Sequence, residues 1–122
     1  MFKSAEMNAS TEIITENIDV LAKALSTSKV SLLRAIGLSY ELNELDVHEN
    51  RTVVLTRLGE IKSLLNAVRP WFSSDSECWY WFINEKLVAF SQTPSEIVSQ
   101  FQERGISALH EWIEERKTAN FQ

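Results

Sequence analysis

The sequence contains few of the residues on which β-rich, disulfide-bonded or membrane-spanning proteins depend. Of its 122 residues, only three are glycine, two are proline and one is cysteine. Sandwiches and barrels need a turn about every ten residues, so this scarcity argues against them. The single cysteine, Cys78, excludes an intramolecular disulfide and a cysteine-rich zinc site. No apolar run approaches the roughly 18 residues of a membrane span, so we expect no membrane partner.

The overall composition is that of a small globular domain. Hydrophobic residues make up 44% of the chain and charged residues 24%. A chain of this length buries roughly two thirds of its unfolded surface, which is enough for one hydrophobic core. Residues 1–10 lack the charged-then-apolar layout of a secretory signal. We therefore expect a soluble, cytoplasmic, all-α protein, a compact bundle of about six to seven helices.

The charge of the chain is acidic, and it is unevenly distributed. The formal net charge is -5, and residues 1–50 carry four basic and eight acidic side chains. Proteins that depend on phosphate contacts usually have a basic patch, and none is visible in this sequence. Non-specific nucleic-acid binding is therefore disfavoured. Specific binding by a dimer stays open, because a local patch can be assembled in three dimensions.

The N-terminal part of the chain predicts short helices. Apolar residues that step by three and four predict a first helix over residues 11–25. The hydroxyl residues 26–28 interrupt it and offer a cap for a second helix, over residues 30–36. That helix ends at Gly37, because glycine readily takes the left-handed conformation that closes a helix.

A helix, a glycine turn and another helix form the layout of a helix-turn-helix unit, whose second helix would enter the major groove of DNA. Ser39 can cap this second helix, over residues 40–46, and a polar loop follows to residue 50. Its three acidic residues would repel phosphate, and it has no Arg or Lys to recognise guanine. Regulation through DNA is therefore an alternative function, with four candidate contacts: Ser39, Tyr40, Asn43 and Arg51.

The clearest helix is predicted over residues 51–68. Its main apolar face steps by four and three: Val54, Leu58, Ile61, Leu65 and Val68. Pro70 closes the helix, because proline disfavours helical backbone at the residue before it. Other apolar residues lie off that face: Val53, Leu55 and Leu64. A second apolar face favours central burial or a dimer seam, and we expect a homodimer.

The C-terminal part predicts three further helices. Residues 74–77 and 93–96 each have the pattern of a capping box, a hydroxyl residue followed by Glu three positions later. Each box begins a helix. Gly105 is expected to interrupt the second of these before a last helix over residues 106–117. The tail, residues 118–122, is expected to be loose.

No pattern in the chain is typical of catalysis. His48 and His110 have no partner at metal-ligand spacing. Cys78 is expected to pack as a small apolar group, although it lies near a predicted helix N-terminus. The sequence contains no phosphate-binding glycine loop and no nucleophile elbow. We therefore predict that the protein is not an enzyme and has no metal site or cofactor.

Aromatic residues are concentrated in one segment, with six of them between positions 71 and 82. Four are consecutive, Trp79 to Phe82, and consecutive helical residues cannot all face one core. At least one should be partly exposed or covered by another chain. Trp and Tyr are enriched at protein interfaces, so this segment is a candidate binding surface.

Several short stretches occur in an order that is typical of one known family. They are residues 33–39, 68–72, 81–82 and 89–94, followed by Gly105 before the last helix. In their order and spacing the chain resembles, over about residues 24–112, the antitoxins of the Xre/MbcA/ParS family of bacterial type II toxin–antitoxin pairs. That family has Leu-Gly-Gly-x-Thr-Pro at 89–94, so Phe90 and Ser91 replace its two glycines.

The resemblance implies a protein partner: a toxin, often a RES-domain enzyme that consumes NAD, whose active site the antitoxin's C-terminal domain covers. Many family members also repress their own operon as dimers. The resemblance also implies an N-terminal region over residues 1–50 and a toxin-binding region over residues 51–122. An orphan helical adaptor is a third alternative. The candidate contacts with the toxin are Trp79, Trp81, Phe90, Ser91, Gln92, Arg116, Lys117 and Phe121.

Overall fold

The computed structural model describes residues 18–39 and 47–120, and within them the predicted all-α fold is confirmed. Residues 18–24 are helical. The labelled elements are α2 (Lys29–Ala35), α3 (His48–Val68), the 3-10 turn η2 (Arg69–Trp71), α4 (Asp75–Asn84), α5 (Pro94–Phe101) and α6 (Glu103–Asn120). None of the helices in these two ranges is long and apolar enough to cross a membrane.

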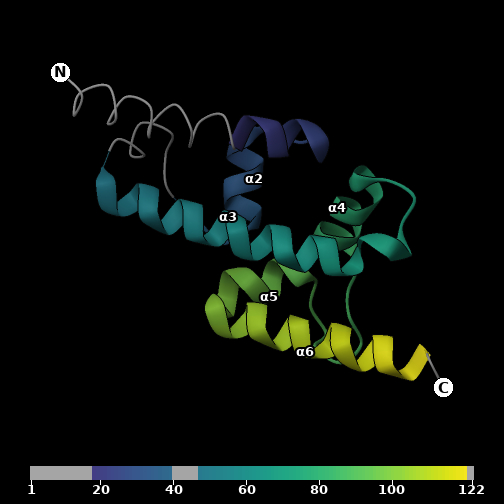
Figure 1. Cartoon of the computed structure of the whole chain (residues 1–122). Helices are drawn as coiled ribbons and strands as arrows, with labels where there is room; N and C mark the ends of the chain where they lie inside the picture. The colour runs from purple at the N-terminus through teal and green to yellow at the C-terminus, as the bar shows by residue number, and fades with distance from the viewer. Residues whose placement is uncertain (1–17, 40–46, 121–122) are drawn as a thin grey trace.

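The long helix α3 runs across the molecule (Figure 1) and packs against α4 and α6, while α5 packs against α2, α4 and α6. The predicted apolar face of α3 is confirmed, since Val54, Leu58, Ile61, Leu65 and Val68 are all buried. Burying a stripe of this kind supplies most of the stability of such a helix. Leu64 is also fully buried, three residues after Ile61 and four before Val68, so the buried face of α3 is wider than predicted.

The polar segment before α3 was predicted to be a loop to residue 50, and that is wrong for residues 48–50. The helix begins at His48, whose carbonyl accepts a hydrogen bond from Thr52 Oγ1 at 3.2 Å. Glu49 lies in the first turn, where a negative charge suits the helix dipole. These residues are polar because this turn of the helix is largely exposed, not because the backbone is irregular.

The end of α2 is held by side chains from distant parts of the chain. Ser28 caps its start as predicted, and Gly37 closes it with a φ of 84°. Three side chains donate to consecutive carbonyls at the closing turn: Ser95 to Ala35, Arg57 to Ile36 and Gln102 to Gly37, at 2.6, 2.8 and 3.3 Å. A helix end leaves such carbonyls unpaired, so these contacts tie α2 to α3 and α5. They connect the two regions that the sequence predicted on either side of residue 50.

The predicted break at Gly105 is wrong, because Gly105 lies inside α6. The chain turns at Gln102 instead, with a φ of 55°, and α6 then runs back along α5 (Figure 1). A Cβ at Gly105 would lie 2.5 Å from the carbonyl oxygen of Ile97. The glycine therefore permits the close approach of α5 and α6 rather than a turn.

The predicted loose tail is wrong for residues 118–120, which continue α6. The hydroxyl of Thr118 donates to the carbonyl of Glu114, one turn earlier, at 2.9 Å. Phe121 lies outside the described residues. So does the predicted helix over 40–46, and the helix-turn-helix unit stays a prediction.

Candidate functional site

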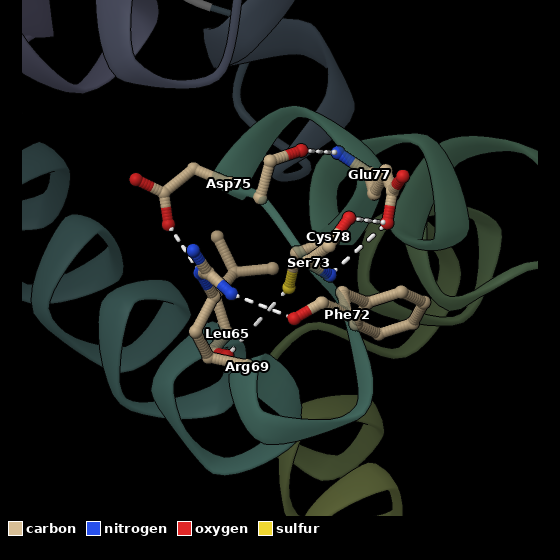
Figure 2. Close-up of polar contacts among 8 residues, drawn as sticks. Leu65, Arg69, Phe72, Ser73, Asp75, Glu77 and Cys78 are labelled. Atoms are coloured by element: carbon tan, nitrogen blue, oxygen red, sulfur yellow. Dashed lines mark hydrogen bonds and ion pairs between the residues drawn. The ribbon is translucent and has the colours of Figure 1, made fainter.

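A short polar network fixes the turn between α3 and α4 (Figure 2). Arg69 donates from Nε to Asp75 Oδ1 and from Nη1 to the carbonyl of Phe72, both at 2.8 Å. One guanidinium thus holds both ends of the turn that connects η2 to α4. The geometry matters for the site because the turn sets the positions of the aromatic side chains on either side of it.

The capping box predicted at the start of α4 is half present. Ser74 Oγ accepts from the backbone N–H of Glu77 at 3.1 Å, as predicted. The Glu77 carboxylate, however, accepts from the N–H and hydroxyl of Ser73, at 3.1 and 2.7 Å, instead of from Ser74. These bonds, chiefly that from the Ser73 hydroxyl, lower the pKa of Glu77 from its ordinary 4.5. Glu77 therefore carries its negative charge at neutral pH.

Cys78 is part of the core, and the expectation that it packs as an apolar group is confirmed. It is 1% exposed, and its Sγ lies 3.6 Å from the carbonyl oxygen of Leu65 (Figure 2). Burial raises the pKa of the thiol to about 11. The thiol is consequently protonated at neutral pH, so it lacks the thiolate that nucleophilic chemistry needs.

Four aromatic rings form one connected aromatic cluster: Trp71, Phe72, Trp81 and Trp112. Trp112 of α6 lies edge-on to Trp71 and stacks with Trp81, with ring centroids 6.1 and 6.3 Å apart. Phe72 lies 5.9 Å from Trp81. The guanidinium of Arg116 sits 4.6 Å from the centroid of Trp112, a cation–π arrangement. The cluster thus joins η2, α4 and α6.

At least one of the four consecutive aromatics was predicted to be partly exposed, and this is confirmed, since Tyr80 is 69% exposed. Trp79 and Trp81, two predicted partner contacts, are only 4% and 8% exposed. Trp79 stacks on Phe82 inside the core, with ring centroids 5.1 Å apart, and so offers a partner no surface in this conformation. Trp71, in η2, is 36% exposed and was not among the predicted contacts.

A shallow hollow of about 440 Å³ lies on the exposed side of α4, and we call it the α4 hollow. Its lining consists of Phe72, Glu77, Tyr80, Trp81 and Glu85. Three aromatic rings and two carboxylates therefore meet at one surface, beside the aromatic cluster. Phe72 and Trp81 belong to both.

The segment between α4 and α5 forms a tight turn that contains three predicted contacts, Phe90, Ser91 and Gln92. Leu87 donates its N–H to the carbonyl of Gln92 at 2.9 Å, and its carbonyl accepts from both Phe90 and Ser91. Ser91 adopts a φ of 58°, a conformation more usual for glycine. Phe90 packs against the core, while the Gln92 side chain donates to Gln100 Oε1 at 2.6 Å.

The other predicted site residues are dispersed. Lys117 is half-buried on α6, next to Arg116, whereas Arg51 lies in the first turns of α3. Ser39 is exposed and lines a second hollow, of about 510 Å³, with residues of α2 and α5. Tyr40 and Asn43 lie outside the described residues. Within the part of the chain that the structure describes, no group of three His, Cys, Asp or Glu side chains could hold a metal ion.

Sequence reasoning missed Trp71, Tyr80 and Trp112 as site residues. One local signal was present, because Trp112 and Arg116 are four residues apart and so share a helix face. No protein-family model matches this chain, and comparisons with curated proteins and with solved structures find no match either. Function is therefore inferred from the chain's own residues and contacts.

Proposed function

We propose that this protein is antitoxin-like and neutralises a cognate toxin by direct binding, through the face that carries the aromatic cluster. The observation that carries the proposal is that Trp71 of η2 is exposed and packs against Trp112 of α6, with Arg116 beside them and the buried Trp81 of α4 beneath. Aromatic residues and arginine dominate binding energy at protein interfaces, and they do so where they are already held in position. The exposed Trp71 ring is held by Trp112, so little conformational entropy is lost when a partner covers it.

Exposed groups around the cluster supply the rest of a binding surface. Tyr80 presents an almost free ring with a hydroxyl, which can add both apolar area and a hydrogen bond. Val88, in the turn that follows α4, is 94% exposed. Tyr80 and Val88 are thus two large side chains, on α4 and just after it, that a protein partner would bury.

The turn over residues 87–92 supports the antitoxin resemblance at the place where this sequence differs from the family pattern. The family has two glycines where this chain has Phe90 and Ser91. Ser91 takes the left-handed backbone conformation that a glycine would favour, with a φ of 58°. The turn therefore adopts the backbone conformation of a glycine although Ser91 stands there, and a toxin can contact a turn of that shape.

A tagged pull-down from the native host, after nuclease treatment, tests the proposal. The wild-type bait is compared with a double variant, Tyr80→Ala plus Arg116→Ala. We call it the cluster variant, because it removes the exposed aromatic and the cation beside the cluster. The matched control is Phe101→Ala plus Arg104→Ala, an exposed aromatic and an exposed arginine where α5 gives way to α6. We expect wild type and the control to retain one stoichiometric partner, and the cluster variant to lose it.

The captured partner should destroy NAD when it is freed from the complex, which is what a RES-domain toxin would do. Recovery of the bait alone would contradict the proposal and favour the alternatives, a DNA-binding regulator of its own operon or an orphan helical adaptor. Equal retention by all three baits would instead mean that the partner binds elsewhere on the chain.

We also propose a homodimer. Two of the three residues that lie off the main face of α3, Val53 and Leu55, are 42% and 41% exposed, which leaves apolar area for a second copy. Light scattering at tens of micromolar should give the mass of two chains. A mass of one chain would refute the dimer without touching the toxin proposal.

A further inference from the structure

We infer that the α4 hollow receives an arginine side chain of the protein partner. This inference rests on the proposed function in that it takes the partner to be a protein, and it adds the chemistry by which that partner is recognised. The hollow combines two kinds of group that a guanidinium uses together. Aromatic faces attract it through their negative quadrupole, and carboxylates accept its N–H groups.

The aromatic part of the hollow is built from both sides of the turn that Arg69 fixes. Phe72, just after η2, and Trp81, on α4, pack together with ring centroids 5.9 Å apart. Tyr80 stands beside them and is largely exposed. Trp81, which is only 8% exposed, therefore forms a largely covered floor, and Tyr80 is the accessible ring on which a flat group can stack.

The two carboxylates lie at opposite ends of that floor. Glu77 and Trp81 are four residues apart and share one face of α4, and Glu85 is the residue that ends the helix, one turn later. A rise of about 1.5 Å per residue places the backbones of Glu77 and Glu85 roughly 12 Å apart along the helix axis, with Trp81 between them in the sequence. A cation stacked on the exposed Tyr80 ring would therefore have one of the two glutamates on either side of it along the chain.

Both carboxylates are available to an incoming cation. Glu77 is held by Ser73 in its charged form, and one of its oxygens, Oε1, takes no part in those bonds. Glu85 is exposed, and no ion pair to it forms among the described residues.

Among the described residues, no cation of the protein itself forms an ion pair with Glu77 or Glu85. Arg69 is paired with Asp75 and the carbonyl of Phe72, and its charge also helps to lower the pKa of Glu77. The α4 hollow thus presents two carboxylates without an ion pair beside aromatic rings.

Arginine fits this site better than lysine for a geometric reason. Its guanidinium is planar, stacks on aromatic rings and forms fork-shaped hydrogen bonds with carboxylates, whereas an ammonium is a compact and strongly hydrated charge. A hollow open to solvent favours the weakly hydrated group, because less water must be removed from it. Charge complementarity of this kind also speeds the encounter with a basic partner surface.

The test uses a short probe, so it needs no knowledge of the toxin. The probe is an end-blocked Gly-Arg-Gly tripeptide, and the comparison peptide carries citrulline, which has the same shape without the charge. Binding is followed through the indole N–H resonance of Trp81 in a ¹⁵N correlation spectrum, assigned by its loss in Trp81→Phe. We expect the arginine peptide to shift this resonance in a saturable way and the citrulline peptide to leave it in place.

Two variants test the parts of the site. Glu77→Gln plus Glu85→Gln keeps the acceptor for Ser73 but removes both charges, and it should weaken the peptide about 5-fold. Tyr80→Ala removes the exposed wall and should weaken it about 3-fold. The matched control, Glu103→Gln plus Glu111→Gln, removes the same charge from a separate hollow on α6 and should change affinity less than about 2-fold.

Equal shifts with both peptides, or unchanged affinity in the Glu77 and Glu85 variant, would overturn the inference. Its failure is distinct from failure of the proposed function. Capture of a toxin together with no peptide binding would refute the arginine site alone, whereas peptide binding without a captured toxin would refute the toxin proposal alone.

Discussion

At the scale of single residues, Arg57 shows how one side chain connects distant parts of the fold. It is only 5% exposed, and its Nη1 donates to the carbonyl of Ile36 at 2.8 Å. Its Nε lies 3.5 Å from a carboxylate oxygen of Glu60, close enough for an ion pair but without hydrogen-bond geometry. The contact with Ile36 is therefore the stronger of the two.

Arg57→Met is expected to lower the free energy of unfolding by about 2 kcal/mol, because methionine keeps the packing of the stem but leaves the Ile36 carbonyl without its charged donor. Urea denaturation measures the change. Arg104→Met, at an exposed position of α6, is the control and should cost less than about 0.5 kcal/mol. Equal losses in the two variants would show that the contact with α2 contributes nothing.

The burial of single side chains could be predicted from the sequence where neighbouring residues in the chain determine it. Cys78 was expected in the core from its apolar neighbours, and it is there. The burial of Arg57 could not be anticipated in this way, because its acceptor lies 21 residues earlier in the chain. A charge is buried only when a partner compensates it, and no sequence pattern identifies the Ile36 carbonyl as that partner.

At the scale of elements, the glycines of α3 and α6 make a matched pair. Gly59 lies in α3 with open space where a Cβ would stand, whereas a Cβ at Gly105 would meet the backbone of Ile97 at 2.5 Å. Both residues are helical, so the loss of backbone entropy on folding is the same for each.

Gly59→Ala is expected to stabilise the protein by about 1 kcal/mol through helix propensity. Gly105→Ala should destabilise it by about 2 kcal/mol, because α5 and α6 must separate to admit the methyl group. Thermal denaturation of the two variants should therefore move the midpoint in opposite directions. A rise in both would mean that α6 does not pack so closely on α5.

The capping box of α5 predicts a dependence of stability on pH. Thr93 and Glu96 exchange hydrogen bonds of 2.9 and 3.1 Å, and the bond from the Thr93 N–H is the main cause that lowers the pKa of Glu96 from its ordinary 4.5. A lowered carboxyl pKa adds stability that is complete above the pKa of the unfolded chain and is lost as pH falls through the folded value.

Glu96→Gln should therefore melt below the wild type at neutral pH, and the gap between the two should close on acidification below pH 4.5. Melting curves from neutral pH to about pH 3 measure this. A gap that stayed constant over that range would contradict the role of the charge.

Elements with local causes could be predicted, and those with tertiary causes could not. The start of α5 was found because Thr93, Pro94 and Glu96 carry the whole capping signal themselves. The start of α3 was misplaced because its first turn is polar, and polarity does not distinguish an exposed helical turn from a loop. Gly105 was misinterpreted because a close approach to Ile97 leaves no local signature.

At the scale of the whole molecule, the aromatic cluster depends on the fold rather than on one segment. The concentration of aromatics at 71–82 was evident in the sequence, and the exposure of one of them was predicted. The contribution of Trp112, about 30 residues later, came only from the fold, which brings its ring on α6 against that of Trp81 on α4. Sequence reasoning therefore found the region of the candidate surface but chose Trp79, which faces the core.

The measurement that tests the central proposal most directly is the NAD-consuming activity of the captured partner, titrated with this protein. We predict that activity falls linearly and is lost at stoichiometric amounts of wild-type chain, since a tight complex covers the active site. The variant Tyr80→Ala plus Arg116→Ala should inhibit only at a large excess. Activity that persists at saturating wild-type chain, or a partner with no activity on NAD, would contradict the proposal of a RES-type toxin neutralised through this face.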